Sequence, residues 1–299
     1  MATHTDIGGL WAALLIPRDA AGDPDERALR RTIEFLVQRG VSNLVLNGAT
    51  GEYCLTTRDE LERLLAVCRE TLDGRGAFLC GIGAAGVRGS IALGHMALDG
   101  GARALLLPMP HFFPYAQEDL IAYCQTVAGE LEAPILLYNL PRFTTPIEAS
   151  TVQFLVETVP NIVGLKDSSG SLDLLRGLPL DKASRIVGDD RALVAALDAG
   201  VCDGVISGVA GVLPELMRFL FGQRGSARYA EVSERLNALI ESLSLFPTPW
   251  GLKLIAGIRG IAPAHFAQPL SGVRSSQARD FEAWFEPWWH ETQRVLAQS

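Results

Sequence analysis

Short apolar runs alternate along this chain with longer segments in which apolar residues recur every three or four positions. Runs of strand length bounded by Gly, Pro, Asn or Ser predict buried strands, and the longer periodic segments predict helices. The expected strands are 11–16, 44–46, 77–80, 104–107, 134–138, 162–166, 185–187 and 204–206. Helices are expected between them at 24–39, 57–72, 87–98, 117–131, 145–160, 172–176 and 190–199.

Two helix starts carry capping signals. Asp23 is expected to cap the first helix, because Pro24 suits a first helical turn and acidic residues follow it. Thr57 and Glu60 have the spacing of a capping box at the start of the second helix. These signals support the division of the chain into strand–helix units.

Eight such units, with strands that are apolar on both faces, predict an α/β fold in which a parallel sheet closes on itself, a (β/α)₈ TIM barrel. An open doubly wound sheet is the alternative, but no glycine-rich dinucleotide turn follows the first strand. The run 81–86 fits G-x-G-x-x-G, yet it follows the third strand and is interpreted as a turn.

Beyond Gly211 the pattern becomes purely helical, with helices expected at 214–221, 227–245, 250–258 and 277–296. We therefore expect a barrel with its active site in residues 1–224 and a C-terminal all-helical extension in residues 225–299. We expect the extension to cover the outside of the barrel or to form an oligomer contact.

Composition narrows the possible partners and location. The 299 residues include 26 basic and 34 acidic side chains, a net charge of -8, without a long run of one sign. Nucleic acid and membrane are therefore not expected as partners. No apolar run approaches membrane-spanning length and no signal peptide is evident, so a cytoplasmic location is expected. The five dispersed cysteines are expected to be reduced, mostly core residues, without metal.

The strand at 162–166 ends on a lysine, which is the first candidate for chemistry. Seating Lys166 among apolar residues costs free energy, and desolvation favours its neutral amine. A neutral amine attacks carbonyl carbon, so Lys166 can form a Schiff base. Alternatively, its stem covers the strand end while its ammonium group reaches water.

Other polar groups stand at the same end of the predicted barrel, where active sites of this fold lie. Gly48 and Gly51 flank Ala49 and Thr50, so the backbone can approach a ligand whose carboxylate the N–H groups and hydroxyl would hold. Tyr138 has a phenol that can donate and accept a proton, or it is a core aromatic. Gly188 leaves space for a substrate. This convergence favours a catalytic Lys166.

Four motifs stand in order at the second, fifth, sixth and eighth predicted strands: 48–52 (GATGE), 138–141 (YNLP), 164–170 (GLKDSSG) and 204–207 (GVIS). Together they resemble the dihydrodipicolinate synthase / N-acetylneuraminate lyase superfamily of pyruvate-type class I aldolases. The resemblance extends to 247–253 in the helical tail. It implies that Lys166 forms the Schiff base, Tyr138 shuttles protons, Thr50 binds the keto-acid carboxylate, and Gly188 and Ile206 line the pocket. It also implies a homotetramer built as a dimer of dimers, and no metal or organic cofactor.

The chain departs from the synthase pattern in one region. Ala49 replaces the first of two adjacent hydroxyl residues, which breaks the expected proton relay. Phe143 stands five positions after Tyr138, where the synthases carry an arginine for the aldehyde's carboxylate. Arg142 is one residue earlier, and where it points stays open. The loop 108–115 also differs from the one that lends a tyrosine to the neighbouring synthase subunit.

Two further features have simple alternatives. His111 is a candidate for catalysis, since histidine as a residue type is a common proton carrier, but it is as readily a loop residue beside aromatics. Asp189 and Asp190 resemble a carboxylate pair but are expected to cap the following helix.

The sequence therefore predicts a Schiff-base lyase, an aldolase or dehydratase, acting on pyruvate or 2-keto-3-deoxy sugar acids. The alternatives are a 4-hydroxy-tetrahydrodipicolinate synthase that condenses pyruvate with aspartate semialdehyde, and a keto-acid-binding protein without turnover.

Overall fold

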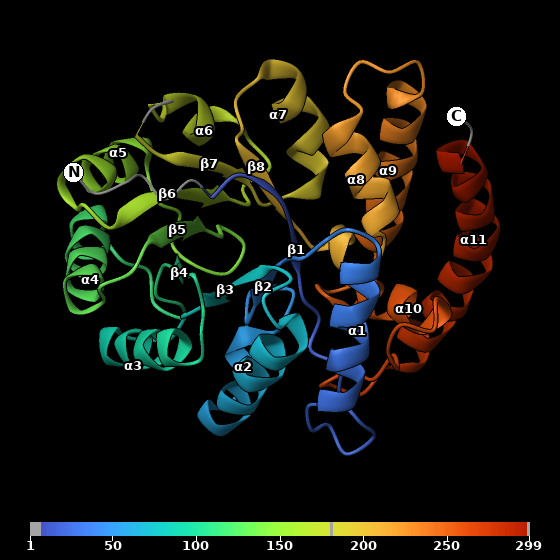
Figure 1. Ribbon diagram of the computed structural model, residues 1–299, viewed down its shortest axis with the longest axis horizontal. Coiled ribbons are helices and arrows are strands. Elements are labelled where there is room, and N and C mark those ends of the chain that lie inside the picture. Colours follow the sequence, from blue (N-terminus) through green and yellow to red (C-terminus); the bar gives the residue numbers. More distant parts are fainter. Residues whose placement is uncertain (1–6, 180–181, 298–299) are drawn as a thin grey trace.

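The computed structural model describes residues 7–179 and 182–297, and its centre is a closed barrel of eight parallel strands in sequence order (Figure 1). The strands are β1 (Gly9–Ala13), β2 (Asn43–Leu46), β3 (Ala77–Gly81), β4 (Ala104–Pro108), β5 (Ile135–Asn139), β6 (Ile162–Asp167), β7 (Ser184–Val187) and β8 (Gly204–Ser207). Because β8 pairs with β1, the sheet has no free edge, and the predicted (β/α)₈ barrel is confirmed.

One helix follows each strand along the outside of the barrel. They are α1 (Glu26–Gln38), α2 (Arg58–Leu72), α3 (Val87–Asp99), α4 (Gln117–Glu130), α5 (Ala149–Thr158), α6 (Asp173–Gly177), α7 (Leu193–Ala199) and α8 (Pro214–Gly222). Three short 3₁₀ helices lie in the loops: η1 (Tyr53–Leu55), η2 (Asp190–Ala192) and η3 (Val209–Gly211). The chain ends in α9 (Tyr229–Leu243), α10 (Trp250–Ile258) and α11 (Gly272–Ala297).

Alternate residues of each strand serve two different apolar layers. One cluster fills the barrel interior and includes Trp11, Val45, Leu79, Leu106, Leu136, Ile186 and Ile206. The intervening strand residues, such as Leu44 and Leu137, join a larger cluster shared with the surrounding helices. Burial on both faces explains why the strands read as continuous apolar runs, and each fully buried Leu or Ile contributes roughly 1.5–3 kcal/mol.

The helix starts match the capping signals in one case and differ in the other. The Thr57–Glu60 capping box is present: Glu60 N–H donates to Thr57 Oγ1 at 3.3 Å and Thr57 N–H to Glu60 Oε2 at 2.7 Å. The expectation that Asp23 caps α1 is wrong, because Asp25 accepts the N–H of Ala28 at 2.9 Å. The N–H of Asp23 instead donates to Asp19, within a turn that precedes the helix.

The first strand is also displaced from its expected range. β1 covers Gly9–Ala13, where 11–16 was expected, because pairing with β8 begins at Gly9. Leu14, Leu15 and Ile16 are buried as predicted, but they lie beyond the paired segment. The apolar run 11–16 therefore includes buried loop residues as well as strand residues.

The C-terminal helices lie together on one side of the barrel, drawn in orange and red in Figure 1. α10 has the expected bounds, whereas α11 begins at Gly272, earlier than the expected 277, and continues through Pro287. Phe281, Phe285 and Trp289 on α11 are buried within the same large cluster as the outer barrel layer. The helical extension and the barrel therefore share one apolar core.

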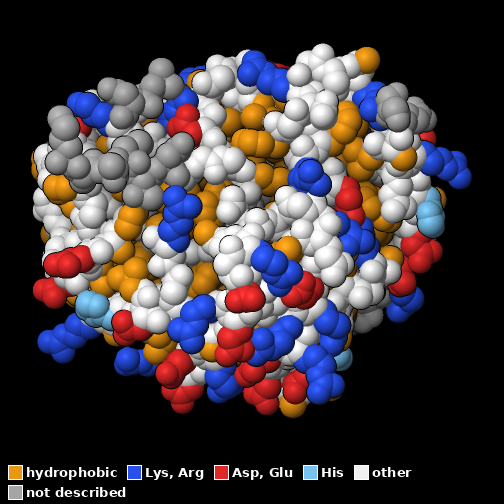
Figure 2. Space-filling view, in the orientation of Figure 1, with side chains coloured by type: hydrophobic (Ala, Val, Ile, Leu, Met, Phe, Trp, Pro, Cys, Tyr) orange, Lys and Arg blue, Asp and Glu red, His pale blue; other side chains and the backbone are white. Residues whose placement is uncertain are grey.

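Charges of both signs lie side by side on the surface. Figure 2 shows them crowded along the lower edge of this face, where α1 and α2 lie. Two ion pairs join these two helices, Arg30–Glu70 and Arg63–Glu26, and Arg75, which follows α2, pairs with Glu34 of α1. Within the described ranges, no helix is long and apolar enough to cross a membrane.

All five cysteines are free, and Cys68, Cys80 and Cys124 are buried. Burial raises the pKa of the Cys68 and Cys124 thiols to about 12, which keeps them protonated and unreactive at neutral pH.

Candidate active site

One pocket lies at the carboxyl ends of the strands, and its lining includes every residue that the sequence singled out for the site. These residues are Ala49, Thr50, Tyr138, Lys166, Gly188 and Ile206. The open space is about 180 Å³, which suits a small molecule. Side chains of α9 and α10 and the connecting segment 246–249 complete its wall, so the helical extension closes over the barrel mouth.

Lys166 and Tyr138 are neighbours on adjacent strands. They stand opposite each other in the β5–β6 register, and Lys166 also pairs with Ile186, which belongs to the interior layer. The Lys166 Nζ lies 4.0 Å from the centroid of the Tyr138 ring, and the residues are only 4% and 3% exposed. No carboxylate in the described ranges forms an ion pair with Lys166, so its amine is held against an aromatic face.

A buried hydrogen-bond network fixes the strand ends that carry this pair. Asn139 Nδ2 donates to Asp167 Oδ1 at 2.7 Å, joining the ends of β5 and β6. Asp167 also accepts the N–H and the hydroxyl of Ser169, at 3.0 and 2.8 Å. The Gly188 N–H donates to the carbonyl of Asp167 at 2.7 Å, which ties in β7. Lys166 is therefore set on a rigid element, as precise chemistry requires.

The turn after β2 has the form of an anion cradle. The N–H groups of Gly51 and Glu52 donate to the carbonyls of Gly48 and Ala49, each at 3.0 Å. The N–H groups of Ala49 and Thr50 have no hydrogen-bond partner within the described part of the chain. A Cβ placed on Gly208 would lie 3.2 Å from Thr50 Oγ1, so the hydroxyl faces the end of β8. Such a turn can hold a small carboxylate.

Two residues of this turn adopt left-handed backbone conformations without being glycine. They are Asn47, with φ of 56°, and Glu52, with φ of 55°. Asn tolerates this region because its short polar side chain bonds locally, and Asn47 Nδ2 donates to the carbonyl of Gly81 at 2.8 Å. For Glu52 the conformation costs about 1–2 kcal/mol. The turn is therefore held in place by contacts outside itself.

Asp190 is a pocket residue whose role the sequence did not reveal. Asp189 does cap η2, since its Oδ1 accepts the N–H of Arg191 at 3.0 Å. Capping is wrong for Asp190, whose Oδ2 accepts the N–H of Val209 at 3.1 Å and braces the turn after β8. Burial raises the pKa of Asp190 to about 6, against the opposing hydrogen bonds from Ser207 and Val209.

Ser168 was also missed, although it stands two positions after Lys166. Its hydroxyl oxygen is buried and has no partner within the described residues. A Cβ placed on Gly188 would lie 2.2 Å from Ser168 Oγ and 2.7 Å from Lys166 Cε, so the three residues crowd one corner. The polar character of the residues following β6 and β7 was the available signal for Ser168 and Asp190.

Some of the residues at which the chain departs from the synthase pattern lie at the pocket. Both Arg142 and Phe143 line the pocket and are exposed, which answers where Arg142 points. His111 is not part of the lining; its ring lies edge-on to Tyr53 at 6.0 Å, as expected for a loop histidine beside aromatics. Within 7–179 and 182–297, no three His, Cys, Asp or Glu side chains are grouped so as to hold a metal ion.

Comparisons with known proteins show which family the chain is similar to. The sequence model of the dihydrodipicolinate synthetase family matches residues 6–286. A 4-hydroxy-tetrahydrodipicolinate synthase from Salinibacter ruber is 36% identical over 219 residues, covering 72% of each chain. One from Corynebacterium aurimucosum is 31% identical over 285 residues, covering 93% of this chain and 92% of that one. The solved 4-hydroxy-tetrahydrodipicolinate synthase structure from Methylacidiphilum fumariolicum SolV superimposes with a TM-score of 0.86 at 25% identity, covering 97% and 99%.

Proposed function

Because this chain belongs to the dihydrodipicolinate synthetase family and is a lyase of that family, we propose that it acts on a 2-keto acid through an imine at Lys166. The observation that supports this proposal best is the buried Lys166 amine, 4.0 Å from the Tyr138 ring and free of any ion pair in the described ranges. An amine without a paired carboxylate is available for attack on carbonyl carbon.

The first half of the reaction joins substrate to enzyme. The keto-acid carboxylate binds the N–H groups and hydroxyl of the 49–50 turn, which places the carbonyl carbon at Lys166 Nζ. Nitrogen attacks that carbon and its proton passes to the carbonyl oxygen, which gives a carbinolamine. A proton from the Tyr138 hydroxyl lets the carbinolamine hydroxyl leave as water, and the protonated imine remains. The Tyr138 hydroxyl relays the protons, because a phenol can both donate and accept one.

The second half uses the imine as an electron sink. The electron pair of the breaking bond at the adjacent carbons moves toward the iminium nitrogen, giving an enamine. The enamine is then reprotonated for cleavage or adds to an aldehyde for condensation. For dehydration it expels the hydroxyl group of the next carbon, which takes up a proton and leaves as water. Hydrolysis returns the Lys166 amine and the keto acid. Gly188 and Ile206 leave space beside the reacting carbons.

For the substrate we propose pyruvate or a 2-keto-3-deoxy sugar acid. Ala49 removes a hydroxyl of the proton relay in the synthase pattern, and Phe143 removes the cation that this pattern places at the aldehyde carboxylate. The unpartnered hydroxyl of Ser168 and the carboxyl of Asp190 offer hydrogen bonds to substrate hydroxyl groups instead.

The alternative is 4-hydroxy-tetrahydrodipicolinate synthesis from pyruvate and aspartate semialdehyde. Two observations favour it: the relatives carry that name, and Arg142 lines the pocket, where it can bind the second carboxylate that Phe143 cannot. A keto-acid-binding protein without turnover is the remaining alternative. A homotetramer and a cytoplasmic location stay predictions that rest on the family resemblance.

Trapping the imine tests the class of chemistry. Pyruvate is added, borohydride reduces any imine, and peptide mass spectrometry maps the adduct. The sequence contains only three lysines, so the map is simple: Lys166, the exposed Lys182 and the buried Lys253. We expect an adduct at Lys166 that is lost in Lys166→Ala. Labelling of Lys182 alone, with longer keto acids as well, would refute the proposal.

Turnover assays then separate the substrates. Aldol cleavage and dehydration are measured on 2-keto-3-deoxy sugar acids, and condensation on pyruvate with aspartate semialdehyde. Turnover of only the semialdehyde would establish the alternative, and an adduct without turnover on any substrate would establish a binding protein.

A further inference from the structure

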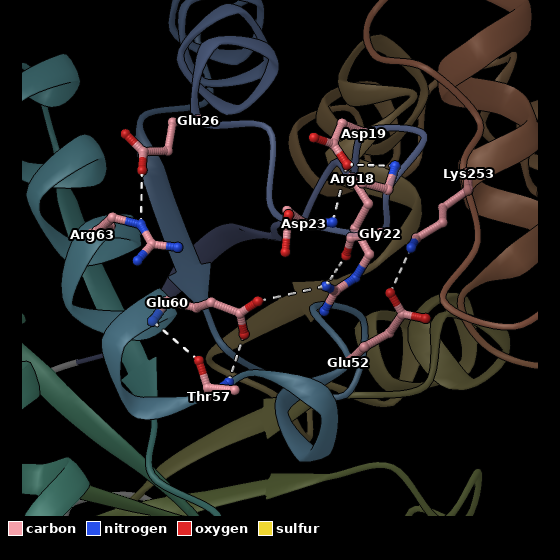
Figure 3. Close-up of polar contacts among 11 residues, drawn as sticks. Arg18, Asp19, Gly22, Asp23, Glu26, Glu52, Thr57, Glu60, Arg63 and Lys253 are labelled. Atoms are coloured by element: carbon pink, nitrogen blue, oxygen red, sulfur yellow. Dashed lines mark hydrogen bonds and ion pairs between the residues drawn. The ribbon is translucent and has the colours of Figure 1, made fainter.

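A buried ion pair joins the C-terminal helices to the turn that we assign to the keto-acid carboxylate. Lys253 Nζ on α10 lies 2.5 Å from Glu52 Oε2 at the end of that turn, and their side chains are 3% and 7% exposed. The two residues are 201 positions apart in the sequence. Figure 3 shows the Lys253 side chain reaching from its helix to the Glu52 carboxylate.

Glu52 occupies a backbone conformation that its residue type disfavours. Its φ and ψ of 55° and 45° are left-handed, and its side chain makes no capping bond to the 3₁₀ helix η1 that follows. Asn47, at the other end of the turn, is held by the neighbouring strand β3 through Gly81, whereas the Glu52 carboxylate is held by α10. Strained residues persist when the surrounding structure over-determines them, and they cluster at functional sites.

The helix that supplies Lys253 also contacts the pocket. Gly251 and Leu252, which precede Lys253, are part of its lining. A Cβ placed on Gly208 would lie 2.9 Å from Leu252 Cδ1 and 3.2 Å from Thr50 Oγ1, so Gly208 is packed between α10 and the turn. The ion pair and this packing place α10 against the residues that would hold the carboxylate.

The surrounding charges leave Glu52 as the partner of Lys253. Burial lowers the pKa of Lys253, and the Glu52 carboxylate opposes that effect, while nearby Arg18 adds to it. The Arg18 guanidinium donates to the carbonyl of Gly22 at 2.7 Å and lies 4.0 Å from Glu60 (Figure 3). The Lys253 ammonium is thus stabilised by the one carboxylate that ends the turn.

We propose that Lys253 and Glu52 are positioning residues: their ion pair holds Glu52 in its left-handed conformation and thereby sets the Ala49 and Thr50 groups for the substrate carboxylate. The proposal rests on the proposed function, because that function assigns the carboxylate to this turn. Neither side chain lines the pocket, so both act through the turn.

Four variants distinguish the effect of backbone strain at position 52 from the effect of losing the Lys253–Glu52 charges. Lys253→Met breaks the pair and leaves Glu52 strained and unpaired. E52Q/K253M removes both charges but keeps a residue that disfavours left-handed φ. E52N/K253M also removes both charges and supplies Asn, which adopts φ of 56° in this same turn. Glu215→Gln is the control, because Glu215 pairs with Arg259 at the far end of α10, at 2.8 Å.

The first readout is the pyruvate concentration that gives half-maximal borohydride trapping at Lys166. We expect Lys253→Met and E52Q/K253M to raise it at least about tenfold, with the wild-type extent of trapping at saturation. In E52N/K253M this concentration should lie within about threefold of the wild-type value, because Asn adopts the left-handed conformation without an ion pair to Lys253. Glu215→Gln should lower thermal stability and leave the concentration unchanged.

A second readout needs no substrate. The amides of residues 51–53 donate hydrogen bonds within the turn. Their hydrogen exchange should be faster than in wild type in Lys253→Met and E52Q/K253M, and should be as slow as in wild type in E52N/K253M. Equal behaviour of the Gln and Asn double variants, or wild-type half-saturation in folded Lys253→Met, would overturn the proposal. If wild type traps no keto acid, the proposed function fails, and the exchange comparison still decides whether the pair holds the turn.

Discussion

Adding one methyl group at Gly188 tests whether the crowded corner beside Lys166 is the reacting centre. A Cβ there would lie 2.2 Å from Ser168 Oγ, 2.7 Å from Lys166 Cε and 3.0 Å from the carbonyl oxygen of Asp167. Ordinary contacts begin at 3.4 Å, so the serine must yield about 1.2 Å (3.4 minus 2.2) and the lysine about 0.7 Å (3.4 minus 2.7).

These shifts fall on the atoms that the proposed mechanism uses. Overpacking of this kind costs about 1–3 kcal/mol of stability. A displacement of the reacting group by about 1 Å costs on the order of 100-fold in rate. We therefore expect Gly188→Ala to fold, to melt a few degrees lower, and to form the Lys166 imine about 100-fold more slowly.

The assay is the rate of borohydride-trapped adduct formation at saturating keto acid, with thermal melting measured in parallel. Gly129→Ala is the matched control, because a Cβ at Gly129 meets nothing within 4 Å. That control should keep its imine rate and gain about 0.5–1 kcal/mol of stability, as alanine suits a helix. A folded Gly188→Ala variant with the wild-type imine rate would refute the assignment of this corner to the chemistry.

Three further substitutions test separate parts of the site. Tyr138→Phe should lower kcat by roughly 10²–10⁴-fold while pyruvate still labels Lys166 slowly, and an unchanged kcat would remove the phenol from the mechanism. Arg142→Ala should leave KM for a 2-keto-3-deoxy acid within about threefold, whereas a rise of about tenfold or more for aspartate semialdehyde would favour the synthase alternative. Because the pKa of Asp190 is raised to about 6, the native state binds the extra proton between about pH 4 and 6, and this contribution to stability is lost as pH rises through 6. The free energy of unfolding of Asp190→Asn, measured in urea, should therefore rise relative to that of wild type between pH 4 and 7, by at most about 3 kcal/mol. A difference between the two proteins that does not change with pH would contradict the raised pKa.

The fold could be predicted from the sequence because the apolar patterns that indicate strands and helices are local and recur in every unit. Each strand is apolar on both faces and each helix has one apolar face, so every unit repeats the same evidence. Errors occurred where local signals compete: Asp19, Asp23 and Asp25 are all plausible turn or cap residues, and only their hydrogen bonds show that Asp25 caps α1. The buried apolar residues 14–16, which follow the end of β1, similarly displaced the expected range of the first strand.

The residues of the candidate site could be predicted to lie together where they end strands. The barrel topology places all strand ends at one mouth, so Lys166, Tyr138 and Gly188 were brought together by fold reasoning alone. Asp190 was misinterpreted because its bond to Val209 depends on how two loops meet. The Lys253–Glu52 pair could not be found from spacing, since no local pattern relates residues on a distant helix and a turn.

Glu52 and Lys253 are 201 positions apart, so during synthesis the turn at 48–52 forms long before the residue that pairs with Glu52. Chain synthesis at roughly 5–20 residues per second leaves Glu52 without its partner for roughly 10–40 s while the next 201 residues are made. Through that interval the first strands and the GATGE turn exist without the contact that holds Glu52 in its left-handed conformation. A nascent or C-terminally truncated chain could therefore expose the Lys166 amine before it could bind a keto acid properly. If the ion pair holds the turn as we propose, the turn is completed only after the C-terminal helices have been made.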